Sequence, residues 1–73
     1  ALYRATALAA LEAGVDADDE AALAALAAGL PLRFEPDQVW LAARDVSDDL
    51  RREDVGAMAS RISAFPAVRE ALR

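Results

Sequence analysis

The sequence contains no cysteine, no histidine and no lysine, and only three glycines and three prolines. The lack of cysteine excludes disulfides and thiol chemistry. The lack of histidine removes the usual proton carrier at neutral pH and the imidazole metal ligand. No apolar run reaches membrane-spanning length, and no charged-then-apolar leader is present. We therefore expect a cytoplasmic protein with no membrane partner.

The few glycines also limit the chemistry that the chain can perform. Glycine occurs only at positions 14, 29 and 56, so no phosphate-cradling loop of the P-loop or dinucleotide type can be written. Ser47, Ser60 and Ser63 have no histidine or lysine that could activate a nucleophilic hydroxyl. We predict that this chain alone binds no ATP and contains no catalytic residue.

A cluster of acids at residues 16–20 invites comparison with a calcium-binding loop. Ala21 occupies the position that requires glycine, and Ala27 the one that requires a bidentate glutamate. We expect a solvated helix start there and no metal site in the chain.

Charge is distributed unevenly along the 73 residues, whose formal net charge is −5. Residues 1–43 carry two arginines and seven acids, whereas residues 44–73 carry six of each. No basic stripe is present, which argues against a nucleic-acid partner. The exclusive use of arginine suits bidentate contacts with a phosphate or a base edge, although a GC-rich genome would explain it equally well.

The first 30 residues predict two helices. Residues 2–13 place Leu8, Leu11 and Val15 on one apolar face, and Gly14 follows as a C-cap. A second helix over about 18–28 is expected, with Asp16 or Asp18 as its N-cap.

The next stretch changes to the two-residue period of strands. Residues 32–35 and 38–41 alternate apolar and polar side chains around the turn pair Pro36-Asp37, which predicts a hairpin. A third short strand is expected through residues 44–46, and Ser47 is expected to cap the turn at residues 48–50. Trp40 is out of phase with its neighbours, so it is either a core residue of the second face or an exposed anchor.

The last third predicts a helix from about Arg52, with a buried stripe of Val55, Met58, Ala59 and Ile62. Pro66 interrupts it, and a helix resumes over residues 67–73. The fold class is therefore α+β, with helices flanking a small two- to three-stranded antiparallel sheet. We expect a single domain over residues 1–73, with a radius of gyration of roughly 11 Å.

Two polar residues near the end of the chain are candidates for ligand binding. Ser60 lies off the buried stripe and shares a face with Gly56 and Ser63, which leaves room for a close approach. Arg69 follows across the proline break and offers a planar fork of donors. Spacing alone also fits a helix-packing face with a solvated arginine.

Several short motifs occur in one order along nearly the whole chain. They are Leu2-Tyr3-Arg4, Gly14-Val15-Asp16, Arg33-Phe34, Asp45-Val46-Ser47, Leu50-Arg51, Ser60 and Pro66-Ala67-Val68-Arg69-Glu70-Ala71-Leu72. Together they resemble the nucleotide-binding portion of bacterial cytidylate (CMP/dCMP) kinases. The sequence departs from the family pattern at Ala43, Arg44 and Arg52, which affects the expected turn and helix start more than the candidate site.

The resemblance implies a role for each candidate residue. Arg4 would contact the phosphate of CMP or dCMP, Ser60 and Arg69 would meet the cytosine edge, and Arg51 would bind phosphate or hold its turn. A surface ion pair with Asp48 or Glu53 is the alternative for Arg51. The resemblance also implies a phosphoryl transfer from ATP with Mg²⁺, both bound outside this chain by the P-loop core and lid of the kinase.

A different class of function also fits the residues. A small acidic α+β domain without enzymatic activity could dock a partner protein through Trp40 or through the face formed by Gly56, Ser60 and Ser63.

Overall fold

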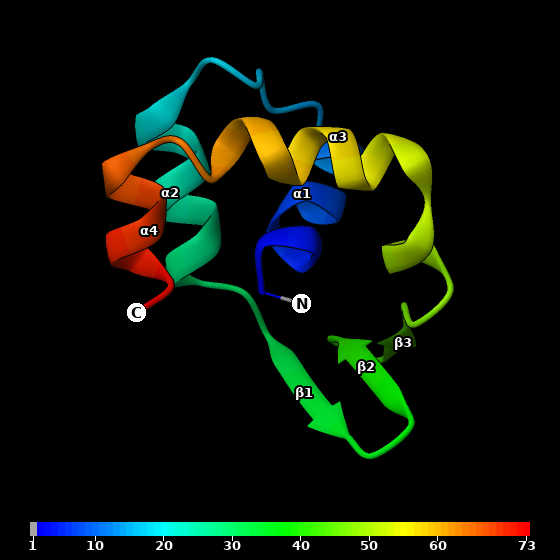
Figure 1. Cartoon of the computed structure of the whole chain (residues 1–73). Coiled ribbons are helices and arrows are strands. Elements are labelled where there is room, and N and C mark those ends of the chain that lie inside the picture. Colours follow the sequence, from blue (N-terminus) through cyan, green and yellow to red (C-terminus); the bar gives the residue numbers. More distant parts are fainter. Residues whose placement is uncertain (1) are drawn as a thin grey trace.

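The computed structural model describes residues 2–73 and contains four α-helices, a three-stranded sheet and a short 3₁₀ helix (Figure 1). The predicted α+β class is confirmed, and the radius of gyration of 11.2 Å matches the expectation for a compact chain. In chain order the elements are α1 (Leu2–Ala13), α2 (Glu20–Ala28), β1 (Leu32–Glu35), β2 (Gln38–Leu41), β3 (Arg44–Asp45), η1 (Asp49–Arg51), α3 (Glu53–Ile62) and α4 (Pro66–Ala71).

Helix α1 has the predicted bounds and lies between the other helices. It ends at Gly14, whose φ of +71° is left-handed and easily adopted by glycine. The predicted apolar face is wrong in one position, because Leu11 is 38% exposed while Leu8 is fully buried. The helix packs against both α2 and α3, so its buried arc shifts to small side chains that permit close approach, namely Ala5, Ala7 and Ala10.

Helix α2 begins later than the sequence indicated. Its N-cap is Asp19, whose side chain accepts a hydrogen bond from the Ala22 amide at 3.1 Å. The prediction of Asp16 or Asp18 is wrong, because Asp16 instead accepts from the Asp18 amide at 2.8 Å and forms a turn before the helix. Asp16, Asp18 and Asp19 have equivalent capping groups. Because Asp16 forms the turn, the helix begins after Asp19.

The sheet is the predicted hairpin extended by a third strand, in the order β1-β2-β3 with both pairs antiparallel. Leu32 pairs with Leu41 and Phe34 with Val39, which puts these four side chains on one face. Leu32, Val39 and Leu41 pack against the core, but Phe34 is 52% exposed because the hairpin extends beyond the helices (Figure 1).

Ser47 forms hydrogen bonds to β2 and β3 of the sheet and does not cap η1, so the capping prediction is wrong. Its hydroxyl accepts a hydrogen bond from the Val39 amide at 2.9 Å and donates to Asp45 at 2.6 Å. Asp48 is the N-cap residue of η1 and makes no side-chain capping bond. The Asp45 carboxylate also accepts from the Ser47 amide at 2.9 Å, which fixes the chain where it leaves β3.

The predicted buried stripe of α3 and the predicted helix break at Pro66 are both confirmed. Val55, Met58, Ala59 and Ile62 are all buried. Pro66 opens α4 at a position where its missing amide removes no helical hydrogen bond.

Helices α2 and α4 pack against each other, and a polar contact joins their first turns. The Ala67 amide near the start of α4 donates to the Glu20 carboxylate of α2 at 3.0 Å. Within residues 2–73, no helix combines the length and apolarity needed to cross a bilayer.

Candidate functional site

The side chain of Arg4 projects from the first turn of α1 across to the start of α3. Its Nη1 donates a hydrogen bond to the carbonyl oxygen of Leu50 in η1 at 2.8 Å. Its guanidinium also lies over Gly56, where a Cβ would stand 3.2 Å from Nη2 and 3.3 Å from Nη1. The bond to Leu50 uses only one of the five N–H donors of arginine. The side chain is exposed overall, so its remaining donors can reach a ligand.

Arg69 borders an open hollow of about 480 Å³ between the start of α1 and one side of α4. Val68 is fully buried and fixes the rotation of α4, which turns Arg69 outward. The lining residues are Tyr3, Pro66, Arg69, Glu70 and Arg73. The hollow therefore brings Tyr3 of α1 close to the predicted base-reading arginine, although they are far apart in the sequence. Within residues 2–73, Arg4 is outside the set that lines this hollow.

Ser60 is exposed on α3, as its phase on the helix predicted. Its carbonyl oxygen accepts a hydrogen bond from the Ser63 hydroxyl at 2.9 Å. Among residues 2–73, Ser60 is outside the set that lines the Arg69 hollow. Its pairing with Arg69 on a cytosine edge stays a prediction.

Arg51 belongs to a second hollow of about 350 Å³, next to the β1–β2 turn. The lining residues are Glu35, Pro36, Asp37, Gln38, Val39, Ser47 and Arg51. In the described part of the chain Arg51 forms no ion pair with Asp48 or Glu53, so the alternative of a surface ion pair is wrong. The structure separates Arg51 from the Arg69 hollow.

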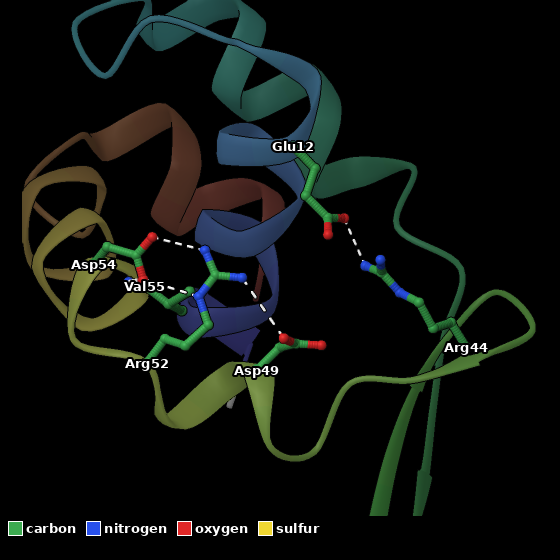
Figure 2. A network of polar contacts seen from close by, with 6 residues as sticks. All are labelled: Glu12, Arg44, Asp49, Arg52, Asp54 and Val55. Atoms are coloured by element: carbon green, nitrogen blue, oxygen red, sulfur yellow. Dashed lines mark hydrogen bonds and ion pairs between the residues drawn. The ribbon is translucent and has the colours of Figure 1, made fainter.

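The neighbouring Arg52 makes the ion pairs at this junction (Figure 2). Its Nη2 lies 2.7 Å from Asp54 Oδ2, and its Nη1 lies 3.6 Å from Asp49 Oδ1. The hydrogen bonds from Arg52 hold the pKa of Asp54 below its usual value. These contacts link η1 to the first turn of α3, the two elements that Arg4 touches.

A second ion pair in Figure 2 links α1 to the sheet. Arg44 Nη2 lies 2.6 Å from Glu12 Oε1, and this hydrogen bond lowers the pKa of the Glu12 carboxyl. Arg44 is one of the positions that depart from the family pattern, and it is the residue that forms this link.

Trp40 and the small-residue face of α3 are both partly covered. Trp40 is half-buried, and the Arg33 guanidinium lies 5.0 Å from the centre of its ring. Its buried Nε1 has no hydrogen-bond partner among residues 2–73. Arg4 covers Gly56, while Ser60 on the same face of α3 is exposed.

Three residues of the hollow were not singled out as site residues from the sequence, namely Tyr3, Glu70 and Arg73. Tyr3 precedes Arg4 and Glu70 follows Arg69 in the chain, and Arg73 lies just past the end of α4. Counting helical phase on α4 would have grouped Pro66, Arg69, Glu70 and Arg73 on one side. The contribution of Tyr3 depends on a tertiary contact that no local pattern reveals.

Comparison with known proteins identifies the family. The sequence model of the cytidylate kinase family matches residues 1–73. The chain belongs to the cytidylate kinase family. It is 54% identical over 72 residues to the cytidylate kinase of Bordetella pertussis and 51% identical over 71 residues to that of Chromobacterium violaceum. A further relative is the cytidylate kinase of Saccharophagus degradans, at 47% identity over 76 residues.

The chain corresponds to only part of these cytidylate kinases. The alignments cover 97–99% of this chain but 32–34% of each relative. The chain therefore spans about a third of the length of the curated relatives that it matches.

Within the described residues there is no group of three or more acidic side chains arranged to hold a metal ion.

Proposed function

We propose that this chain is the nucleoside-monophosphate-binding portion of a cytidylate kinase and that it forms a single domain. It would hold CMP or dCMP while the γ-phosphoryl group of ATP is transferred to it, giving CDP or dCDP. The observation that carries the proposal is the position of Tyr3 of α1 in the same hollow as Arg69 of α4. Arg4 follows Tyr3 in α1 but is not among the lining residues, and we propose that it binds the phosphate of the same ligand.

The binding roles follow from the chemistry of the two arginines. A nucleoside monophosphate has an anionic phosphate at one end and a flat polar base at the other. Arg4 would bind the phosphate, since it keeps free donors at the first turn of a helix, where the backbone dipole also favours an anion. Arg69 would donate to the acceptor atoms of the base, and Ser60 would add a hydroxyl that can donate or accept.

The remaining parts of the reaction would come from outside this chain. ATP and Mg²⁺ supply the phosphoryl group and neutralise its charge, and a P-loop core and a lid would hold them. The residues described above would bind the acceptor and restrict the access of water to it. Arg51, in its separate hollow, would hold the η1 turn, or it would contact a phosphate only after the kinase closes over the nucleotide. The cytoplasm is the location that fits this role, and nucleic acids and membranes are not expected as partners.

A nucleotide titration tests the proposal. Amide chemical shifts of the 73-residue chain would be followed while CMP, UMP and AMP are added separately. We expect the largest shifts and the tightest binding with CMP, centred on Tyr3, Arg4 and Arg69. Equal shifts with all three nucleotides would contradict a cytosine-reading site.

Two variants with a matched control assign the shifts to residues. Arg4→Gln should weaken the binding of CMP and of inorganic phosphate, whereas Arg69→Gln should weaken CMP alone. Arg61→Gln is the control, because Arg61 is exposed and pairs with Asp18 away from the hollow. If Arg61→Gln weakened CMP as much as Arg69→Gln, binding would be a general effect of charge.

The alternative of a non-enzymatic interaction module is tested by the gene. A Gly-x-x-x-x-Gly-Lys-Ser/Thr run a few dozen residues upstream in the same reading frame is expected for a kinase. If that run is missing, the interaction module becomes the better interpretation.

A further inference from the structure

The guanidinium of Arg4 is held by two elements other than its own helix. Its Nη1 donates to the carbonyl oxygen of Leu50 in η1 at 2.8 Å, and its Nη2 lies closest to the backbone of Gly56 in α3. Leu50 and Val55 are buried, so both elements are anchored in the core. The position of the Arg4 guanidinium therefore depends on how η1 and the first turns of α3 lie relative to each other.

The joint between η1 and α3 consists of a single residue. Arg52 follows the last residue of η1 and precedes the first residue of α3, and its backbone is extended, with φ −60° and ψ 144°. It occupies the N-cap position of α3 but makes no side-chain capping hydrogen bond. An N-cap side chain fixes a helix start by accepting from a backbone amide, which arginine cannot do. Another contact must restrain this joint.

The side chain of Arg52 supplies that restraint through carboxylates on both sides of the joint (Figure 2). Its Nε and Nη2 donate to the two carboxylate oxygens of Asp54 at 3.0 Å and 2.7 Å, and its Nη1 lies 3.6 Å from Asp49 Oδ1. Asp54 Oδ1 also accepts from the Val55 amide at 2.9 Å. An isolated exposed ion pair contributes little, but bidentate geometry and a second carboxylate make this one an exception.

We propose that Arg52 is a positioning residue for phosphate binding. By joining Asp49 to Asp54 it fixes the Leu50 carbonyl relative to Gly56, and it thereby holds the guanidinium of Arg4 in place. This inference rests on the proposed function, which assigns the phosphate to Arg4. Arg52 acts through Arg4 and does not contact the nucleotide. A guanidinium that is already held in place loses less freedom when it binds a phosphate, so the affinity is higher.

A double-mutant cycle tests this role. The affinities for inorganic phosphate and for CMP are measured by amide shifts in the original chain, Arg52→Gln, Arg4→Gln and the double variant. We expect Arg52→Gln to weaken both affinities at least about twofold, the lower end of the coupling within one hydrogen-bond network. In the Arg4→Gln background the same substitution should change neither affinity. Nitrogen relaxation of Arg4 Nε should also show a more mobile guanidinium in ligand-free Arg52→Gln.

Two further variants control for net charge and for folding. Arg61→Gln makes the same charge change in the last turn of α3 and breaks an ion pair with Asp18, and it should leave both affinities unchanged. Arg52→Lys keeps the charge but lacks the planar fork. If urea unfolding shows that Arg52→Gln does not fold, the cycle is completed with Arg52→Lys, which should show the same dependence on Arg4.

The outcomes separate this inference from the proposed function. If Arg4→Gln weakens phosphate binding but a folded Arg52 variant does not, the role of Arg52 is wrong and the proposed function stands. Equal weakening with and without Arg4, or equal weakening in Arg61→Gln, would also overturn the role of Arg52, because the effect would then come from net charge. If Arg4→Gln leaves phosphate binding unchanged, the proposed role of Arg4 is wrong and this inference is wrong with it.

Discussion

The guanidinium of Arg4 lies over the backbone of Gly56, on the one position of α3 that has no side chain. The nearest guanidinium nitrogen would be 3.2 Å from an added Cβ, which is tighter than ordinary van der Waals contact. Glycine at this position lets α3 accept the arginine, and the arginine in turn reaches the Leu50 carbonyl. Helix α1, η1 and α3 thus meet at one side chain.

Replacing Gly56 with alanine should stabilise the chain less than helix propensity alone would. Alanine in place of glycine inside a helix gains about 1 kcal/mol, but the new Cβ would displace the Arg4 guanidinium. In an Arg4→Ala background that contact is absent, and the full gain should appear. Urea unfolding of the four chains measures the difference, and equal gains in both backgrounds would contradict the contact.

Replacing Ala42 with glycine should stabilise the fold. It is the one non-glycine residue among residues 2–73 with a positive φ, +56°, in the turn between β2 and β3. A left-handed conformation costs a residue with a Cβ about 1 kcal/mol, so Ala42→Gly should raise the free energy of unfolding by about 0.5–1 kcal/mol. Ala43→Gly, next to it without positive φ, is the control and should lower it.

Removing the Ser47 hydroxyl should loosen the sheet. Ser47→Ala leaves the Val39 amide without its acceptor, and we expect a loss of about 1 kcal/mol in the free energy of unfolding. Hydrogen exchange at Val39 should accelerate, while exchange in α2 should not. Unchanged protection at Val39 would show that this hydrogen bond adds nothing to the sheet.

The stability of the β3 region should fall in acid. The Ser47 hydroxyl and amide bond to Asp45 and lower the pKa of its carboxyl in the folded chain. A lowered folded-state pKa contributes stability above the unfolded-state pKa and loses it as the pH falls through the folded-state pKa. Unfolding free energies between pH 7 and pH 2 should therefore decline below about pH 4, and Asp45→Asn should make this decline shallower. An identical decline in Asp45→Asn would place the acid sensitivity elsewhere.

The ion pair between Glu12 and Arg44 should be weak and sensitive to salt. Both side chains are more than 40% exposed, and exposed pairs typically contribute about 0.2–1 kcal/mol. A double-mutant cycle with Glu12→Gln and Arg44→Gln should give a coupling in this range at low salt. In 1 M NaCl the coupling energy should nearly vanish, because the Debye length is then about 3 Å. A coupling that persists in high salt would indicate a pair more shielded from solvent.

The features of the fold that follow local rules could be predicted from the sequence. The stripe on α3 follows the helical period, the hairpin follows alternation around Pro36-Asp37, and Pro66 marks the start of α4. Leu11 was assigned to the core wrongly, because packing on two sides of α1 moves the buried arc. Asp19 was missed as a cap, because three acids of equal capping ability lie within four residues.

The candidate site was predictable only in part. Arg4, Ser60 and Arg69 could be singled out as exposed polar residues on helices, with their roles implied by the resemblance. The hollow that Tyr3 and Arg69 line depends on α1 and α4 both packing against α2, and spacing cannot show that. Glu70 was overlooked because a lone exposed glutamate carries no signal until its neighbours in space are known.

The hydrogen bond from the Ala67 amide to Glu20 connects the two halves of the chain. Glu20 is the first residue of α2, a helix that contributes no candidate site residue, yet it holds the first turn of α4 in place. The position of α4, and with it the direction in which Arg69 faces, therefore depends partly on a carboxylate that lies 47 residues before Ala67 in the sequence. Replacing Glu20 would loosen the first turn of α4 without altering any candidate site residue.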